Sequence, residues 1–441
     1  MNARLLRVVR TVIRADSDPT RQILFANLMQ SQPLVRLVFG VHQKLRGTWG
    51  STAVVSCYGL ATLLTIAPPL NRRARVLVLA KHENARRQVA RIISFLGEAD
   101  CGWVRTGVRT LVNGSSLAGL ALCFSRSRFV RTFRVVGAID VRHGFLVSCR
   151  VAGAIAWYGR ARSMLSAHKP RAILVSSDSN PEEVGFDGAA RALAIPRVFV
   201  SHAYPTPLSP PLDFSLSILE GEAAVGARKR KGPIKGEVIL VGIEGDSTAL
   251  EPDRFRRPSP VIGIFTPKAI AWSTLIATID DCREYFGAKQ IVIRWHPSML
   301  QPPRLAGLLR DHAGIIETPR TASLEEVSRQ CDWVIADENS NVHLQVLKLG
   351  IPTVAVSDLG LYPKSHADHY GFVASRIVYP PVQSIRDVEP VAFASFFSGS
   401  WPMRFREYDA SYLRSHETVA SEVRTAILRL VDGSSAKEFT A

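Results

Sequence analysis

Short apolar runs that end in polar residues recur along this chain. The runs that we expect to form strands lie at 75–80, 172–176, 197–200, 261–265, 291–293, 333–336 and 353–356, with further strands at 215–219 and 237–241. Continuous apolar runs of this length are typical of parallel strands that are covered on both faces. The stretches between them, such as 181–193 and 269–286, have the spacing of helices. We therefore expect an α/β fold with two Rossmann-like domains facing a cleft.

Two similar segments mark equivalent positions in the two halves. Leu193-Ala-Ile-Pro196 and Leu349-Gly-Ile-Pro352 each end a predicted helix just before a predicted strand. A stretch rich in Pro, Asp and Arg at 245–260 indicates the linker between the halves. The resulting division is a basic helical extension (1–71), a first Rossmann-like domain (72–250), a second Rossmann-like domain (258–403), and a C-terminal helix and tail (404–441).

The N-terminal extension contains two segments that could contact a membrane. Apolar residues at 5, 6, 9, 12 and 13 alternate with arginines, which predicts a basic amphipathic helix. Such a helix either packs on its own domain or lies on anionic lipid. The segment 47–71 has no charged residue and is long enough to cross a bilayer, but it holds many small and polar residues and two prolines. For this segment we expect a buried helix or a shallow membrane contact rather than a span.

The charge of the chain restricts its partners. The 441 residues carry a formal net charge of +17, which favours nucleic acid, an anionic membrane surface or a phosphorylated substrate. The basic run 228–231 has no interleaved aromatic residues, and no nucleic-acid-binding module is present, so we expect no nucleic-acid partner. Six dispersed cysteines without metal spacing favour a reducing cytoplasm. We therefore expect a cytoplasmic protein whose basic surface can hold it at the inner face of the plasma membrane.

Arg294, His296 and Pro297 follow the predicted strand 291–293 directly. Ligands of open α/β sheets bind at the carboxyl ends of strands. A guanidinium and an imidazole at such a place can stabilise the negative charge of a departing nucleotide without a metal. Thr266 and Lys268 follow the preceding strand and belong to the same predicted phosphate site. The alternative is an ordinary packed loop with a structural histidine.

Asn339, Ser340 and Asn341 lie between the predicted strand 333–336 and the predicted helix that follows. Side-chain hydroxyl and amide groups and the free N–H groups of a helix start can bind a phosphate there. The alternative is plain capping of the helix, for which serine and asparagine are the preferred residues.

These two segments together resemble the carboxyl half of GT-B glycosyltransferases that carry an HP motif and a serine motif. Such families include bacterial sialyl- and polysialyltransferases, capsular Kdo transferases and CDP-glycerol glycerophosphotransferases. The matching segments are Ile291-Val-Ile-Arg-Trp-His-Pro-Ser298 and 331–353. The resemblance implies a GT-B-like fold in which His296, Pro297 and Ser340 hold the phosphate of a CMP- or CDP-linked donor. The chain departs from the families where Asn339-Ser340-Asn341 replaces their Ser-Ser pair, which leaves the donor open.

The same resemblance implies an acidic base in the first half, which would deprotonate the acceptor hydroxyl. Asp178 is the first candidate because it lies in a predicted strand-exit loop, and Glu83 is the second, followed by Glu182 and Asp187. The alternative for Asp178 is a structural Asx turn. The basic residues that we expect to line the acceptor side or the cleft are His82, His202, Lys364 and His366.

The sequence favours neither a metal site nor a dinucleotide cofactor. Asp280-Asp281 falls inside a predicted helix, and His366, Asp368 and His369 are expected to form a polar loop. No Gly-x-Gly-x-x-Gly segment is present. We therefore expect no metal, and no cofactor other than the nucleotide-sugar donor, which is a substrate.

The function that these features predict is an inverting, metal-independent glycosyltransferase or a related phosphotransferase. It would move a sugar from a CMP- or CDP-linked donor to a surface polysaccharide, such as a capsule, or to a lipid-linked glycan. Two alternatives stay open at this point. One is a nucleotide-sugar epimerase of the same fold, and the other is a non-catalytic basic protein that binds lipid or nucleic acid.

Overall fold

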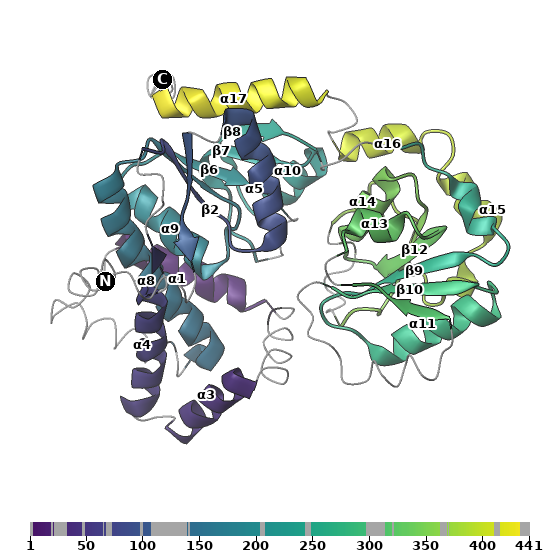
Figure 1. The fold of residues 1–441 in the computed structure, drawn as a ribbon, viewed down its shortest axis with the longest axis horizontal. Coiled ribbons are helices and arrows are strands. Elements are labelled where there is room, and N and C mark those ends of the chain that lie inside the picture. Colours follow the sequence, from purple (N-terminus) through teal and green to yellow (C-terminus); the bar gives the residue numbers. More distant parts are fainter. Residues whose placement is uncertain are drawn as a thin grey trace.

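The computed structural model of the chain places two α/β halves beside each other (Figure 1). It describes residues 3–18, 21, 33–45, 49–64, 66–67, 73–97, 100–106, 139, 142–202, 208–242, 248–296, 314–319, 322–361, 368, 370–409 and 415–432. Each half is built on one parallel sheet, which confirms the predicted α/β fold of GT-B-like type.

The sheet of the first half has six strands, and every neighbouring pair is parallel. In spatial order they are β3 (Cys101–Trp103), β2 (Val76–Leu79), β5 (Ala172–Val175), β6 (Arg197–Val200), β7 (Asp213–Leu219) and β8 (Lys235–Leu240). The side chains of β2 alternate between the two faces of this sheet. Leu77 and Leu79 pack into one apolar cluster, and Val76 and Val78 pack into another. Burial on both faces explains why the strand is apolar throughout.

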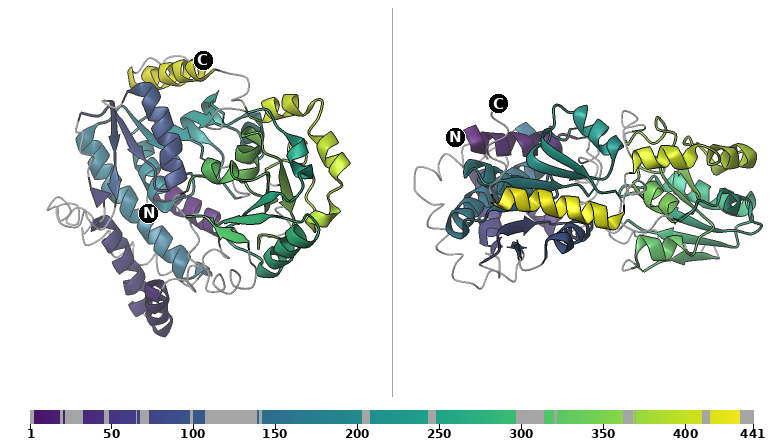
Figure 2. Two further views of the ribbon diagram at one scale, coloured as in Figure 1. Left: turned by 45° about the vertical axis from the view of Figure 1, so that its right-hand side comes forward. Right: turned by 90° about the horizontal axis from the view of Figure 1, so that it is seen from above.

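Helices cover both faces of the first sheet. Three helices share the cluster of Leu77 and Leu79: α1 (Ala3–Asp16), α8 (Phe145–His168) and α9 (Pro181–Ala192). The opposite face is covered by α5 (Glu83–Leu96) and by α17 (His416–Asp432), which returns from the C-terminal end of the chain (Figures 1 and 2). The last helix therefore contributes to the core of the first half.

The sheet of the second half has five strands. In spatial order they are β11 (Ile315–Glu317), β10 (Gln290–Arg294), β9 (Val261–Phe265), β12 (Trp333–Asp337) and β13 (Thr353–Val356), all pairing in parallel. The helices of this half are α11 (Trp272–Glu284), α13 (Leu324–Ser328), α14 (Val342–Lys348), α15 (Pro390–Phe396) and α16 (Trp401–Tyr408). The remaining short elements are β1 (Ile66–Ala67), β4 (Arg105–Thr106), α10 (Glu222–Lys229), and the 3₁₀ turns Pro252–Arg256 and Ile385–Asp387.

The basic N-terminal helix packs on its own domain, which is one of the two predicted alternatives. Val8, Val9 and Val12 are buried, Arg4 donates to the carbonyl oxygen of Ala192, and Arg7 pairs with Asp213. Among the described residues, the extension also contains α3 (Pro33–Lys44) and α4 (Trp49–Leu64). Across the described ranges, no helix is both long and apolar enough to cross a membrane.

Most of the predicted elements agree with the structure, with small shifts at their ends. Ser323 and Glu326 have the spacing that predicts a capping box. The structure confirms it, because each side chain bonds the backbone N–H of the other. The short strands β3 and β11 were not predicted, since neither is an uninterrupted apolar run. The sequence also predicts a helix around 304–311, and these residues lie outside the described part of the chain.

Candidate functional site

The candidate site begins at the strand ends of the first sheet. Because β2, β5 and β6 are parallel neighbours, the segments that follow them leave the sheet at one edge. These segments are Lys81–His82, Ser176–Asn180 and Ser201–His202.

Glu183 holds two of these segments together. It lies in the first turn of α9 and is fully buried. Its carboxylate accepts backbone N–H bonds from Ser176 at 2.8 Å, Ser177 at 2.6 Å and Lys81 at 3.2 Å. Burial raises the pKa of Glu183 to about 7, although these N–H groups oppose the rise. Glu183 therefore fixes the spacing between the ends of β2 and β5.

Two histidines stand at this edge with different hydrogen bonds. The Nδ1 atom of His202 lies 2.6 Å from the carbonyl oxygen of Ser176, so Nδ1 carries the proton. Its Nε2 atom has no hydrogen-bond partner among the described residues. In contrast, Nε2 of His82 lies 3.0 Å from Nδ2 of Asn180, which donates to it. Of the two rings, His202 is therefore the one with a basic nitrogen, Nε2, that can accept a proton from a bound molecule.

In the second half, Thr266 ties the end of β9 to the end of β10. Its hydroxyl accepts from the backbone N–H of His296 at 3.2 Å and donates to the carbonyl oxygen of Arg294 at 3.4 Å. Burial, with the positive charges of Lys268 and Arg294, lowers the pKa of His296 to about 3. The Nε atom of Arg294 is buried without a hydrogen bond to a described residue. His296 is thus an uncharged ring beside two cations.

Charges of the two halves act on one another at this point. Desolvation and Lys268 of the second half both lower the pKa values of His82 and His202 in the first half, and His82 has a pKa of about 4. Desolvation also lowers the pKa of Lys268, as does the charge of Arg21, although Lys268 stays exposed to solvent. The strand ends of the two sheets therefore form one cluster, in which the cations Lys268 and Arg294 lie among the uncharged rings of His82, His202 and His296. We call these five residues the cationic cluster.

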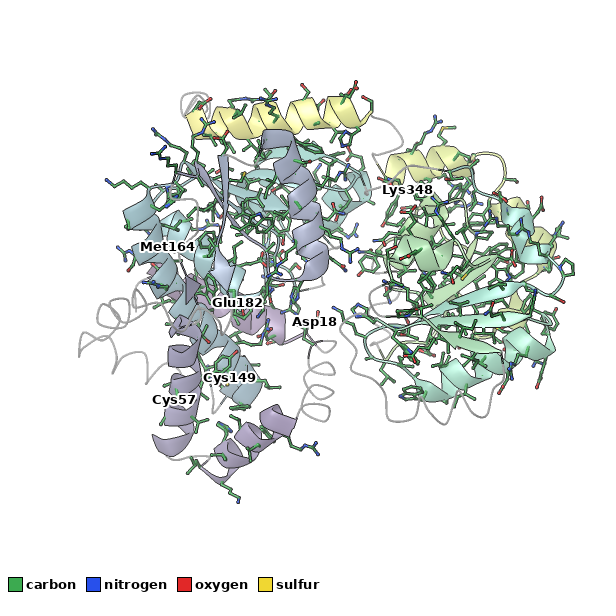
Figure 3. The ribbon with its side chains drawn as sticks, viewed as in Figure 1. Asp18, Cys57, Cys149, Met164, Glu182 and Lys348 are labelled. Carbon is green, nitrogen blue, oxygen red and sulfur yellow. The ribbon has the colours of Figure 1, made fainter. Side chains whose placement is uncertain are left out.

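Three of the four acidic residues predicted for catalysis, Asp178, Glu182 and Asp187, are engaged in ion pairs. Asp178 forms an ion pair with Arg228, whose side chain is almost fully buried over the ring of Phe199. Glu182, labelled in Figure 3, pairs with Lys81, and its Oε2 atom is buried without a described hydrogen-bond partner. Glu83 begins α5.

The loop after β12 is acidic, in contrast to the cluster around Lys268 and Arg294. Desolvation, Asp358 and Asp368 raise the pKa of Glu338, and burial raises the pKa of Asp337 to about 7. Ser340 accepts from the backbone N–H of Val342 at 3.3 Å, as a helix cap does. The Oδ1 atom of Asn341 is buried without a described hydrogen-bond partner. This loop is separated from His296 by β9, which corresponds to about 10 Å between strand axes.

The structure therefore groups some predicted residues and separates others. His82, His202, Thr266, Lys268, Arg294 and His296 come together, and the loop of Asn339, Ser340 and Asn341 is two strands away. Pro297, Lys364 and His366 lie outside the described residues.

Three residues of the site were not predicted: Glu183, Arg21 and Arg87. Arg21 donates to Ser179 Oγ at 2.7 Å, and the charge of Arg87 adds to desolvation in lowering the pKa of Arg294. The sequence could have indicated Glu183, because it is an acidic residue in the first turn of a helix that follows the end of a strand. Arg21 is too far from the other residues in sequence for any such signal.

In the described part of the chain, no group of three or more His, Cys, Asp or Glu side chains could hold a metal ion.

The sequence matches no protein-family model and no curated protein. Among solved structures, the chain is similar to S. aureus MnaA with UDP, at 11% identity over 81% of this chain and 96% of that one, with a TM-score of 0.48. It is also similar to UDP-N-acetylglucosamine 2-epimerase from Rickettsia bellii (13% identity, 81% and 96% covered, TM-score 0.45). A third match is the calicheamicin glycosyltransferase CalG4 (12% identity, 81% and 99% covered, TM-score 0.45). At these scores the similarities identify neither a family nor an activity for this chain.

Proposed function

We propose that this protein is a glycosyltransferase that takes a sugar from a nucleotide-activated donor. The observation that carries the proposal is the cationic cluster at the facing strand ends, in which Lys268 of one half acts on His82 and His202 of the other. Two cations beside neutral imidazole rings, one of which has an available nitrogen, suit the transfer of a group from a phosphate to a hydroxyl.

The donor phosphate is assigned to Lys268, Arg294 and His296. Lys268 is accessible to solvent, and the buried Nε atom of Arg294 has no hydrogen bond to a described residue. A bound phosphate would also favour protonation of His296, whose pKa is low while only cations surround it. The acidic loop after β12 disfavours phosphate, so we assign it to the ribose, with Glu338 as an acceptor for hydroxyl groups.

His202 is the proposed general base. In the transfer, the oxygen of the acceptor hydroxyl attacks the anomeric carbon of the donor sugar, and Nε2 of His202 takes the proton of that hydroxyl. The bond from that carbon to the donor phosphate breaks, and the leaving nucleotide keeps the electron pair near Lys268 and Arg294. A single displacement inverts the configuration of the anomeric carbon.

Asp178 then has a supporting role in this proposal. Its negative charge raises the pKa of His202 against the larger effect of desolvation, so it stabilises the imidazolium that forms during transfer. It also neutralises Arg228. The first-half residue that touches the acceptor is therefore His202 and not the acidic residue that the family resemblance implies.

A nucleotide-sugar epimerase is a second candidate, and Glu182 is the observation that favours it. Its buried Oε2 atom has no hydrogen bond to a described residue, and its charge acts on His82. A carboxylate in that position could move a proton at a sugar carbon without any acceptor. Product analysis separates the candidates, since a transferase releases nucleotide in proportion to the glycosylated acceptor, and an epimerase changes the sugar without one.

The first test is a thermal shift with cytidine nucleotides, which the HP and serine motifs favour, and with uridine nucleotides for comparison. At a hundred times the dissociation constant, a ligand stabilises its protein by about 2.7 kcal/mol. We expect CMP or CDP to raise the melting temperature and His296→Ala to abolish the rise. His416→Ala, which removes an exposed histidine on α17, is the matched control. The absence of a shift with any nucleotide would remove both enzyme candidates.

A further inference from the structure

The helix α3 has one face anchored in the protein and an apolar face directed outward. Its inner side contacts the start of α8, where the rings of Phe39 and His42 lie 5.7 Å and 4.6 Å from the ring of Phe145. On the outer side, Leu37 is 65% exposed and Val41 is 44% exposed. Residues four apart on a helix are neighbours on one face, so these two side chains form a continuous patch.

Basic residues surround this apolar patch. Arg36 and Lys44 are exposed on the same helix, and with Leu37, Gly40 and Val41 they line a hollow of about 420 Å³. We call these five residues together with Val38, which is also exposed, the α3 outer face.

The α3 outer face has no acidic neighbours within the extension. Residues 1–71 contain eight arginines and lysines, and their only acidic residues are Asp16 and Asp18. Both aspartates are buried, and Asp16 is held by Arg21 and Arg150. The surface of this extension therefore offers positive charge and apolar side chains without any carboxylate.

The neighbouring helix α4 adds to the uncharged character of this region. It contains no charged residue, and Val54 and Val55 pack with Phe39 against α8. Its exposed residues include Tyr58 and Cys57, and Figure 3 labels Cys57 on this helix. The pair of helices projects from the first half beyond its sheet (Figure 1).

We propose that the α3 outer face docks the protein on an anionic lipid bilayer. The apolar side chains Leu37, Val38 and Val41 would enter the boundary between headgroups and acyl chains, and Arg36 and Lys44 would contact lipid phosphates. A second copy of the chain fits less well, because two surfaces without acidic residues repel each other. The proposal does not depend on the enzymatic activity, and it places the docking element in α3 rather than in α1, whose apolar side is buried.

Vesicle flotation with the full chain tests this proposal. We expect binding to phosphatidylcholine vesicles that contain phosphatidylglycerol, little binding to phosphatidylcholine alone, and a decrease with salt. The double variant Leu37→Ser/Val41→Ser should lower the bound fraction about tenfold, since it removes most of the exposed apolar surface. The matched control is Val391→Ser/Met403→Ser, at 64% and 60% exposed positions of the second half, and it should bind like the parent.

Two outcomes would overturn the proposal. One is equal binding of the parent and the Leu37→Ser/Val41→Ser variant, with both melting at the same temperature. The other is a parent that is dimeric by light scattering and becomes monomeric in this variant without binding vesicles, which would assign the face to self-association.

A polarity-sensitive dye gives a second, local readout. Cys57 is the exposed one among the described cysteines, and Cys123 lies outside the described residues, so both are replaced by serine. Val38→Cys then places the dye on the α3 outer face. We expect a blue shift with anionic vesicles, and an unchanged spectrum on protein that floats with them would exclude this face as the contact.

Discussion

The proton on Nδ1 of His202 is directed at the carbonyl oxygen of Ser176, 2.6 Å away. The backbone N–H of the same Ser176 donates to Glu183, which also receives Ser177 and Lys81. A buried carboxylate thus positions the peptide that fixes the tautomer of the histidine. This chain of contacts leaves Nε2 of His202 as the acceptor for a proton from the substrate.

Replacing His202 by alanine should therefore reduce catalysis more than donor binding. Removal of a general base costs about a hundredfold to ten-thousandfold in kcat. We expect a loss of this size in transferase kcat, with a small change in the nucleotide dissociation constant. Because desolvation lowers the pKa of His202, the parent's kcat/KM should fall at acid pH with a midpoint below the usual histidine value. An unchanged kcat in this variant, with His416→Ala as the control, would exclude His202 as the base.

Glu183→Gln should destabilise the protein because the amide group would place N–H donors against backbone N–H donors. Leaving buried groups unsatisfied in this way costs about 1 to 3 kcal/mol. Urea unfolding measures the loss. Glu182→Gln is the matched control, since Glu182 makes a partly exposed ion pair with Lys81 whose removal should cost less than about 1 kcal/mol. Equal losses in the two variants would contradict the role given to Glu183.

The parts of this structure that could be predicted are those that depend on residues close together in the sequence. The apolar strands β2, β5 and β12 follow from burial on both faces. His82, His202 and His296 could be selected because each lies within three residues of the end of a strand, β2, β6 and β10 respectively. The short strand β11 could not be predicted, because its Glu317 interrupts the apolar pattern.

The grouping of the site depends on distant parts of the chain. Arg21 reaches Ser179 and acts on Lys268, although the three residues are far apart in sequence. Likewise, the sequence indicated a phosphate site at Asn339–Asn341, but the carboxylates of Asp358 and Asp368 that make this region acidic come from later segments. Charge at a site is a sum over elements, and only the fold shows which elements contribute.

The ion pair of Asp178 and Arg228 should be important for stability. Their side chains are 10% and 3% exposed. Breaking such a pair from one side leaves an uncompensated buried charge, which costs about 3 to 5 kcal/mol. We expect Asp178→Asn to lose stability of this order, and the double variant Asp178→Asn/Arg228→Met to recover part of it in a double-mutant cycle. An Asp178→Asn variant of parental stability that loses all activity would instead make Asp178 the base.

Gly185 allows α9 to approach α8 closely. A Cβ atom at Gly185 would lie 2.6 Å from the carbonyl oxygen of Ala154 and 2.7 Å from Cβ of Trp157. We expect Gly185→Ala to destabilise the protein by about 1 to 3 kcal/mol, because backbone atoms must move. Gly226→Ala on α10 is the control, since its Cβ would meet only the flexible end of Arg230 at 3.9 Å. That variant should be neutral or stabilised by about 0.5 to 1 kcal/mol, and a loss equal to that of Gly185→Ala would refute the packing explanation.

The buried ring of His343 should make stability decrease at acid pH. Burial lowers its pKa to about 4, with the hydrogen bond to the Asp337 carbonyl opposing, so between pH 6.5 and 4 the unfolded chain binds a proton that the folded protein excludes. Stability from this group is complete above pH 6.5 and falls as the pH falls toward 4, by about 3 kcal/mol in all. Glu183 and Asp337, with pKa values raised to about 7 by burial, act in the opposite direction and lose stability as the pH rises through 7. The difference in unfolding free energy between the parent and His343→Gln isolates this group, and in urea unfolding at pH 7, 5.5 and 4.5 it should shrink as the pH falls. A difference that does not change with pH would show that His343 does not titrate in this way.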